Sequence, residues 1–306
     1  MIGHLRVKSP WSQLGLFLGL LGMALILTSA IIALVITSRG LPMAGLDKLD
    51  WSNPHVVSTM KLVQALSSII MFLLPAVAFG FITFNGRPFY FLGLRPPVKP
   101  QMYLLAMLCI VLSMPFVLWL GDLNQHISLP EWMTRMEKDA GRQMALFLKT
   151  SNSFDVVLNV FIIAFLPALC EEIFFRGVLQ RIVINVCKNP WSGIIVTGIL
   201  FSAAHLQFQG FLPRMFLGVI LGALYWYSGS LWTSILAHFV NNAVQVVAVS
   251  YAPEYIDKNP SLPAFAAFIS GISVIGILWA YKSFSTITYE KVYEPDELNR
   301  SNEFIA

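Results

Sequence analysis

An uncharged apolar stretch near the N-terminus limits the environment in which this chain can fold. Residues 12–37 contain no Asp, Glu, Lys or Arg. A helix of about 20 mainly apolar residues crosses a hydrocarbon core roughly 30 Å thick, so this stretch is long enough to span a bilayer. Of the 306 residues, 57% are hydrophobic and only 12% are charged, whereas about a quarter are charged in a typical soluble domain. The sequence therefore predicts an integral membrane protein.

Seven further apolar segments predict additional spans. They are residues 62–84, 101–121, 154–175, 191–208, 211–228, 229–250 and 262–281. Arg6 and Lys8 precede the first span as they would in a signal peptide, but its apolar stretch is much longer than an h-region of about 7 to 15 residues. We therefore expect a retained helix and an all-α, polytopic bundle of about eight transmembrane helices.

The chain divides into three expected parts without a detectable internal repeat. Residues 1–153 hold the N-terminal transmembrane helices and an amphipathic connection, residues 154–250 form a core, and residues 251–306 contain the last span and a polar tail. Within the connection, apolar and basic residues mix over 122–153, which is typical of a helix lying at the membrane interface. An ordinary polar helix packed on the bundle is the alternative.

Basic residues give a weak indication of orientation. With both termini cytoplasmic, Lys and Arg are slightly more numerous on the cytoplasmic side, as the positive-inside rule requires. We expect a multi-pass protein of the cell membrane (inner or plasma) with cytoplasmic termini. The net charge of +4 indicates no nucleic-acid partner, because basic residues beside anionic lipid headgroups account for it.

The three cysteines do not form a recognisable framework. Cys109, Cys170 and Cys187 lie within or beside apolar segments and include no CxxC pair, so they predict neither a disulfide scaffold nor a metal site. Cys170 is adjacent to Glu171 and is conceivable as a nucleophile. We favour a small buried hydrophobe, which is the usual role of a free cysteine.

Ionisable side chains are concentrated in one part of the membrane region. Residues 168–242 carry Glu171, Glu172, Arg176, Arg181, His205, Arg214 and His238. A charge at mid-membrane costs at least about 2.5 to 3.5 kcal/mol on insertion scales, so such groups usually face an internal cavity and serve a function. We therefore expect one polar site built from the fourth to the seventh spans.

Helical geometry separates the two adjacent glutamates. Glu172 precedes Arg176 by four residues, the favourable order for an intrahelical ion pair, whereas Glu171 is rotated by about 100°. Glu172 is thus expected to be structural and Glu171 to be free for chemistry. Pro167 should kink or open the helix just before them. The alternative is a helix end at the interface, with Arg176 and Arg181 snorkelling to the headgroups.

Two histidines inside apolar helices add to this cluster. Phe201 and His205 share one helical face, and His238 and Asn242 share another. A lone membrane histidine commonly bonds between helices, but two of them beside paired carboxylates suit hydrolysis. A carboxylate and an imidazole can deprotonate an attacking water, while a second imidazole and an amide can stabilise the oxyanion that forms.

These motifs together resemble a known family. The matching residues are Glu171-Glu172-x-x-x-Arg176 followed by Gly177, Phe201-x-x-x-His205, and His238-x-x-x-Asn242 within GSLWTSILAHFVNN at 229–242. The order and the depth of the motifs are similar to those of the CPBP family, which comprises CAAX proteases and bacteriocin-processing enzymes. It includes the type II CAAX prenyl endopeptidases, the lysostaphin resistance protein A-like proteins and abortive-infection-like domains. The resemblance covers roughly residues 155–248.

The resemblance implies roles for individual residues of an intramembrane endopeptidase. Glu171 and His205 match the pair that activates water, and His238 and Asn242 match the pair that stabilises the oxyanion. Glu172 and Arg176 match the remaining motif positions, for which we keep the ion-pair role. The implied substrate is a membrane-associated peptide or protein, with a CAAX-type or lipidated C-terminus. The lipid bilayer is the other expected partner.

Metal dependence and activity leave alternatives open. Glu171, His205 and His238 form a donor set that binds zinc with one water, but the HExxH spacing is absent and Asn242 is a poor zinc ligand. The family resembles glutamate-type proteases that work without metal, so we favour an enzyme without a cofactor over a zinc-dependent version. A non-catalytic membrane transport or immunity protein is the rival.

Overall fold

The computed structural model of the chain describes residues 9–43, 49–83, 88–148, 150, 152–252 and 262–293. These residues form helices, turns and connections, and no strand occurs among them. The prediction of an all-α, polytopic membrane bundle is confirmed. Arg6, Lys8 and the last part of the predicted polar tail lie outside the described residues.

Six helical stretches in the described part of the chain are long and apolar enough to cross a membrane. Two are interrupted by π-helical turns. The stretches are α1 (Pro10–Ser38); α2 (Pro54–Ser68), η2 (Ile69–Leu73) and α3 (Leu74–Thr83); α5 (Gln101–Gln125); α7 (Ser153–Asn159), η3 (Val160–Phe165), α8 (Leu166–Glu172), η4 (Ile173–Gln180) and α9 (Arg181–Cys187); α11 (Phe211–Ser228); and α13 (Ala264–Phe284).

The two other predicted spans are helices of a different kind. The predicted span 191–208 is α10 (Pro190–Ala204), which has only 15 residues. The predicted span 229–250 is α12 (Leu231–Tyr251), which has 21 residues but carries His238, Asn241 and Asn242 along its length. The structure therefore supports six clear spans, while these two helices contribute polar groups inside the bundle.

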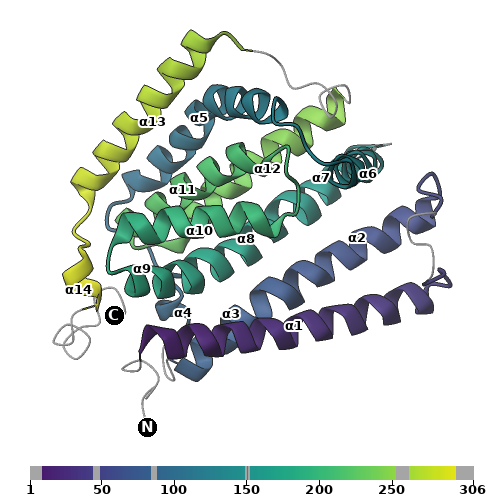
Figure 1. Ribbon diagram of the computed structural model, residues 1–306, viewed down its shortest axis with the longest axis horizontal. Coiled ribbons are helices and arrows are strands. Elements are labelled where there is room, and N and C mark those ends of the chain that lie inside the picture. Colours follow the sequence, from purple (N-terminus) through teal and green to yellow (C-terminus); the bar gives the residue numbers. More distant parts are fainter. Residues whose placement is uncertain are drawn as a thin grey trace.

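The central helices are surrounded by helices with exposed apolar sides. Figure 1 shows α11 in the middle of the bundle, with α10, α12 and α5 around it and with α1 and α13 on opposite sides. Burial follows this arrangement. Of the most apolar 18-residue stretch of each helix, 61% is buried in α11, against 17% in α1 and 22% in α13. Several polar residues of α10 and α12 are buried in this arrangement, among them Ser202, His238 and Asn241.

The helix that carries the paired glutamates is irregular at two places. The π-helical segment η3 ends at Phe165, two residues before Pro167, and η4 begins at Ile173, directly after Glu172. Proline lacks a backbone donor and its ring clashes with the carbonyl four residues earlier, which a widened π turn relieves. The predicted disturbance before the glutamates is therefore present, and π turns often occur at functional sites.

Three further helices lie at the two ends of the bundle. The predicted amphipathic segment contains α6 (Glu131–Leu148), which lies at the same end as the start of α7, whereas α4 (Pro88–Phe91) and α14 (Tyr289–Tyr293) lie at the opposite end (Figure 1). Trp132 of α6 packs edge-on against Phe208, with the ring centroids 6.0 Å apart. Met136 and Met144 remain exposed, so α6 contacts the bundle and also presents an apolar surface outward.

Candidate active site

Glu172 is the centre of a buried ionic network. Its side chain is fully buried, and its Oε1 atom accepts hydrogen bonds from Nη1 of Arg176 and from Nδ1 of His238, the latter at 2.9 Å. The predicted ion pair within the helix is therefore present. The bond to His238 was not predicted, and it ties α8 to α12 across 66 residues of sequence.

Arg176 is held inside the protein rather than at a membrane surface. It is fully buried, its Nη2 donates to the carbonyl of Gly218 at 3.1 Å, and its guanidinium lies 4.5 Å from the ring centroid of Phe201. Arg181 is also buried, with its guanidinium 4.1 Å from the ring centroid of Phe91. The snorkelling interpretation of these two arginines is therefore wrong.

A pair of glycines exposes the carbonyls that these polar side chains need. Gly218 and Gly222 are four residues apart on α11, and Gly222 accepts a hydrogen bond from Nε2 of Gln180 at 3.0 Å, one turn along from the Gly218 contact. A Cβ atom on Gly218 would lie 3.0 Å from the Cα of Gly198 in α10. Small residues at this spacing allow membrane helices to approach closely, so the glycines position α10 against α11.

Phe201 brings the two predicted histidines to one place. Its ring contacts His205 at a centroid distance of 5.0 Å and His238 at 5.7 Å, both edge-on. His205 caps α10, and its Nδ1 atom bonds the carbonyl of Phe201 at 2.9 Å. Because a carbonyl only accepts, Nδ1 carries the proton, and Nε2 of a neutral His205 is free to act as a base.

Glu171 differs from its neighbour in its bonding: both glutamates have a buried Oε2 atom without a partner among the described residues, but only Glu172 is bonded through Oε1. Glu171 is close enough to His205 for electrostatic interaction, and His205 interacts in the same way with His238. The structure thus brings Glu171, His205 and His238 together, with no direct hydrogen bond between Glu171 and His205 in the described part of the chain.

Asn242 lies one turn beyond His238 on α12. Its Oδ1 atom accepts a hydrogen bond from Nδ2 of Asn241 at 3.1 Å. That bond occupies the acceptor of the Asn242 amide and leaves its NH₂ group to donate. His238 and Asn242 therefore lie on the same face of α12, as their four-residue spacing predicts.

Known proteins match the part of the chain that carries this site. Residues 153–244 match the family described as Type II CAAX prenyl endopeptidase Rce1-like. We call this segment the Rce1-like domain after the family that it resembles. The resemblance to the CPBP family that the motifs predicted is therefore confirmed for these residues.

The curated relatives match only part of this chain, and the chain spans less than two thirds of the length of each. An uncharacterized 24.3 kDa protein of Escherichia coli is 36% identical over 88 residues, which is 28% of this chain and 41% of the relative. The uncharacterized protein YpbD of Bacillus subtilis strain 168 is 24% identical over 138 residues, covering 44% of this chain and 66% of the relative. No solved structure matches the chain significantly.

The donor groups of the Rce1-like domain do not form a ready metal cage. Among the residues that the structure describes, no three or more His, Cys, Asp or Glu side chains are grouped so that they could hold a metal ion. Nδ1 of His238 is already bonded to Glu172 and Nδ1 of His205 to Phe201. Bonds at Nδ1 leave the Nε2 atoms of both rings available as ligands, so zinc binding by the predicted set of Glu171, His205 and His238 stays a prediction.

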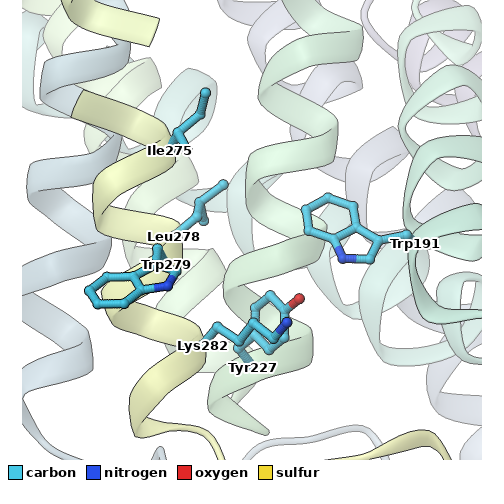
Figure 2. Close-up of a pocket in the computed structure, with 6 residues that line it drawn as sticks. All are labelled: Trp191, Tyr227, Ile275, Leu278, Trp279 and Lys282. Atoms are coloured by element: carbon cyan, nitrogen blue, oxygen red, sulfur yellow. The ribbon is translucent and has the colours of Figure 1, made fainter. Parts of the chain in front are cut away.

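Cys170 and the apolar groove of Figure 2 are separate from this chemistry. Cys170 is fully buried in α8, as expected for a small core residue. The groove lies between α10, α11 and α13 and is lined by Trp191, Tyr227, Ile275, Leu278, Trp279 and Lys282 (Figure 2). Trp191 is at the start of α10, at the opposite end from His205, so the groove does not include the polar site.

Two features of the Rce1-like domain were not predicted from the sequence. The first is the role of Gly218 and Gly222 as carbonyl acceptors for Arg176 and Gln180. Their four-residue spacing within an apolar segment is a signal that could have identified them. The second is the bond between Glu172 and His238, for which the sequence gives no local signal because the residues belong to different helices.

Proposed function

We propose that this protein is an intramembrane endopeptidase that uses Glu171 and His205 to activate water. One observation carries the proposal: Glu172 is engaged through Oε1 by Arg176 and His238, whereas the partly buried Glu171 makes no side-chain hydrogen bond or ion pair with the described residues, and its Oε2 atom is buried. A buried carboxylate oxygen normally has a partner. Glu171 is therefore the carboxylate suited to bind a reacting water.

Proton transfer follows from the hydrogen bonds of His205. With Nδ1–H donated to Phe201, Nε2 of His205 accepts a hydrogen bond from the water that Glu171 also holds. As the water oxygen attacks the peptide carbonyl, its proton passes to the Glu171 and His205 pair and then to the leaving amine. Such general-base catalysis typically contributes about 10² to 10⁴ in rate.

His238 and Asn242 stabilise the oxyanion in this proposal. Nδ1–H of His238 donates to Glu172, so Nε2 donates to the oxyanion when the ring is protonated. The NH₂ group of Asn242 supplies a second donor.

The substrate is a peptide that reaches the site from the membrane. The Rce1-like match supports a CAAX-type or lipidated substrate, because such chains are held at the bilayer. We place the enzyme in the cell membrane with both termini in the cytoplasm, which the predicted distribution of basic residues favours.

Two variants test the catalytic assignment. We expect Glu171→Gln and His205→Ala to lose activity by about 10² or more, measured by mass spectrometry of membrane peptides incubated with purified protein in liposomes. The control is Glu131→Gln, which changes an exposed glutamate of α6. Normal turnover in either site variant contradicts the proposal, and failure of the wild type on every CAAX-type and lipidated peptide favours a transport or immunity role.

Zinc content distinguishes the two forms of the enzyme. We expect active protein to contain less than stoichiometric zinc and to keep its activity in a chelator, measured by elemental mass spectrometry and peptide cleavage. Stoichiometric zinc that is lost together with activity overturns the metal-free mechanism.

A further inference from the structure

The turn that follows His205 lies where unsatisfied backbone groups are costly. Helix α10 ends at Ala204 after 15 residues, which is about 22 Å at 1.5 Å per residue and less than the roughly 30 Å of a hydrocarbon core. Leu206 then has a left-handed backbone, with φ of 53°, and α11 begins at Phe211. Irregular backbone at this depth is tolerated only where protein or a wet cavity satisfies it.

Residues outside the Rce1-like segment satisfy this turn. The carboxylate of Glu137 in α6 accepts hydrogen bonds from the backbone N–H of Phe208 and from that of Gln209, the latter at 3.2 Å. Asn124, near the end of α5, donates from Nδ2 to the carbonyl of Phe208 and accepts from the N–H of Leu212, both at 2.8 Å. The side chains of Glu137 and Asn124 thus bond the backbone of Phe208 and Gln209 in the connection and of Leu212 in the first turn of α11.

Inside the domain, Arg214 holds the same turn from the other side. Its Nη1 donates to Oε1 of Gln207 at 2.9 Å, and its Nη2 donates to the carbonyl of Gln207. Ser202 adds a bond from Oγ to the carbonyl of Phe211 at 2.7 Å. The turn is therefore fixed by polar contacts at nearly every residue between His205 and α11.

Among the described residues, the ring of His205 makes a single hydrogen bond, which goes to its own helix at Phe201. Its position relative to Glu171 on α8 is consequently set by where α10 ends and by how the next residues are held. We infer that Glu137, together with Asn124, positions His205 for catalysis. This inference rests on the proposed function and extends it to residues outside the segment that matches the family.

Substitutions at Glu137 test the inference, with a control on the same helix. Glu137→Ala removes the acceptor, whereas Glu137→Gln keeps a carbonyl oxygen that accepts from the same two N–H groups. Glu131→Ala is the control, because Glu131 is exposed and pairs only with Arg135 in the described structure, at 3.8 Å. We expect Glu137→Ala to lower kcat by about 10- to 100-fold with KM nearly unchanged, and Glu137→Gln and Glu131→Ala to stay near the wild type.

A second measurement does not depend on activity. The rate at which diethyl pyrocarbonate modifies His205, mapped by peptide mass spectrometry, should change in Glu137→Ala and not in Glu131→Ala. An unchanged modification rate overturns the inference, and so does a changed rate with wild-type kcat. If the wild type cleaves no peptide, the proposed function fails, and the modification rate alone decides whether Glu137 positions His205.

Discussion

Helices α1 and α11 are both apolar, yet the structure uses them in different ways. Only 17% of the most apolar 18-residue stretch of α1 is buried, against 61% of that of α11. A Cβ added to Gly15, Gly19 or Gly22 of α1 would meet nothing within 4 Å, whereas one added to Gly222 of α11 would lie 2.6 Å from Oε1 of Gln180. The same residue type is therefore dispensable in one helix and required in the other.

This difference between inner and outer helices arises because lipid, and not water, surrounds the bundle. Lipid tails are as apolar as leucine, so burying apolar side chains between membrane helices gives little driving force, and association depends on close packing and interhelical hydrogen bonds. The inner helices have both, through glycine contacts and the network around Glu172. The outer helices mainly present apolar surface to lipid, so substitutions should have unequal effects in the two regions.

The largest difference is expected at the buried ion pair. Arg176→Leu leaves the carboxylate of Glu172 buried, with His238 as its one remaining partner in the part of the chain that the structure describes. Breaking a buried pair in this way costs about 3–5 kcal/mol. Arg135→Leu removes an exposed pair with Glu131, which contributes at most about 1 kcal/mol. Equilibrium unfolding in SDS mixed micelles, followed by circular dichroism, measures both. Equal losses would contradict the contrast between inner and surface charges.

A smaller difference is expected at two glycines. Gly193→Ala in α10 places a Cβ 2.7 Å from the Cα and 2.8 Å from the N of Ile184 in α9, and backbone atoms cannot move aside as a flexible side chain can. Overpacking of this kind typically costs 1–3 kcal/mol. Gly22→Ala in α1 meets nothing within 4 Å, so we expect no loss of stability. The same unfolding measurement applies, and an equal loss in both variants would show that α1 is packed as tightly as α10.

The sequence predicted the outer helices better than the contacts between the inner helices. The outer spans were predictable because lipid requires long uncharged stretches, and the α1 prediction of 12–37 lies within the observed Pro10–Ser38. The pairing of Glu172 with Arg176 was predictable because it is local to one helix. Both follow from rules that act over a few neighbouring residues.

Inside the bundle, distant parts of the chain decide the geometry. The prediction of a span over 191–208 was too long, because α10 ends before His205 and the following turn is held by Asn124 and Glu137. No local pattern joins those residues to His205. The bond between Glu172 and His238 likewise joins two different helices. The sequence therefore reveals the chemical groups of the site but not which of them bond to one another.

The smallest effect is expected where an outer helix does make a polar contact. Pro115 interrupts α5, and Ser270 of α13 lies at the break, donating from Oγ to the carbonyl of Leu112 at 2.5 Å and accepting from the N–H of Phe116 at 3.2 Å. An interhelical bond of this type is worth about 0.6 kcal/mol on average and at most about 1.7. We expect Ser270→Ala to lose that amount.

The matched control on the same helix is Ser273→Ala, because within the described ranges the exposed Ser273 bonds only the carbonyl of Ile269 in its own helix, at 2.9 Å. That variant should be neutral in the SDS unfolding measurement. If Ser270→Ala is also neutral, α13 is held to α5 by packing alone. If it costs as much as Arg176→Leu, hydrogen bonds at the periphery are as important as the buried ionic network, and the division between inner and outer helices no longer holds.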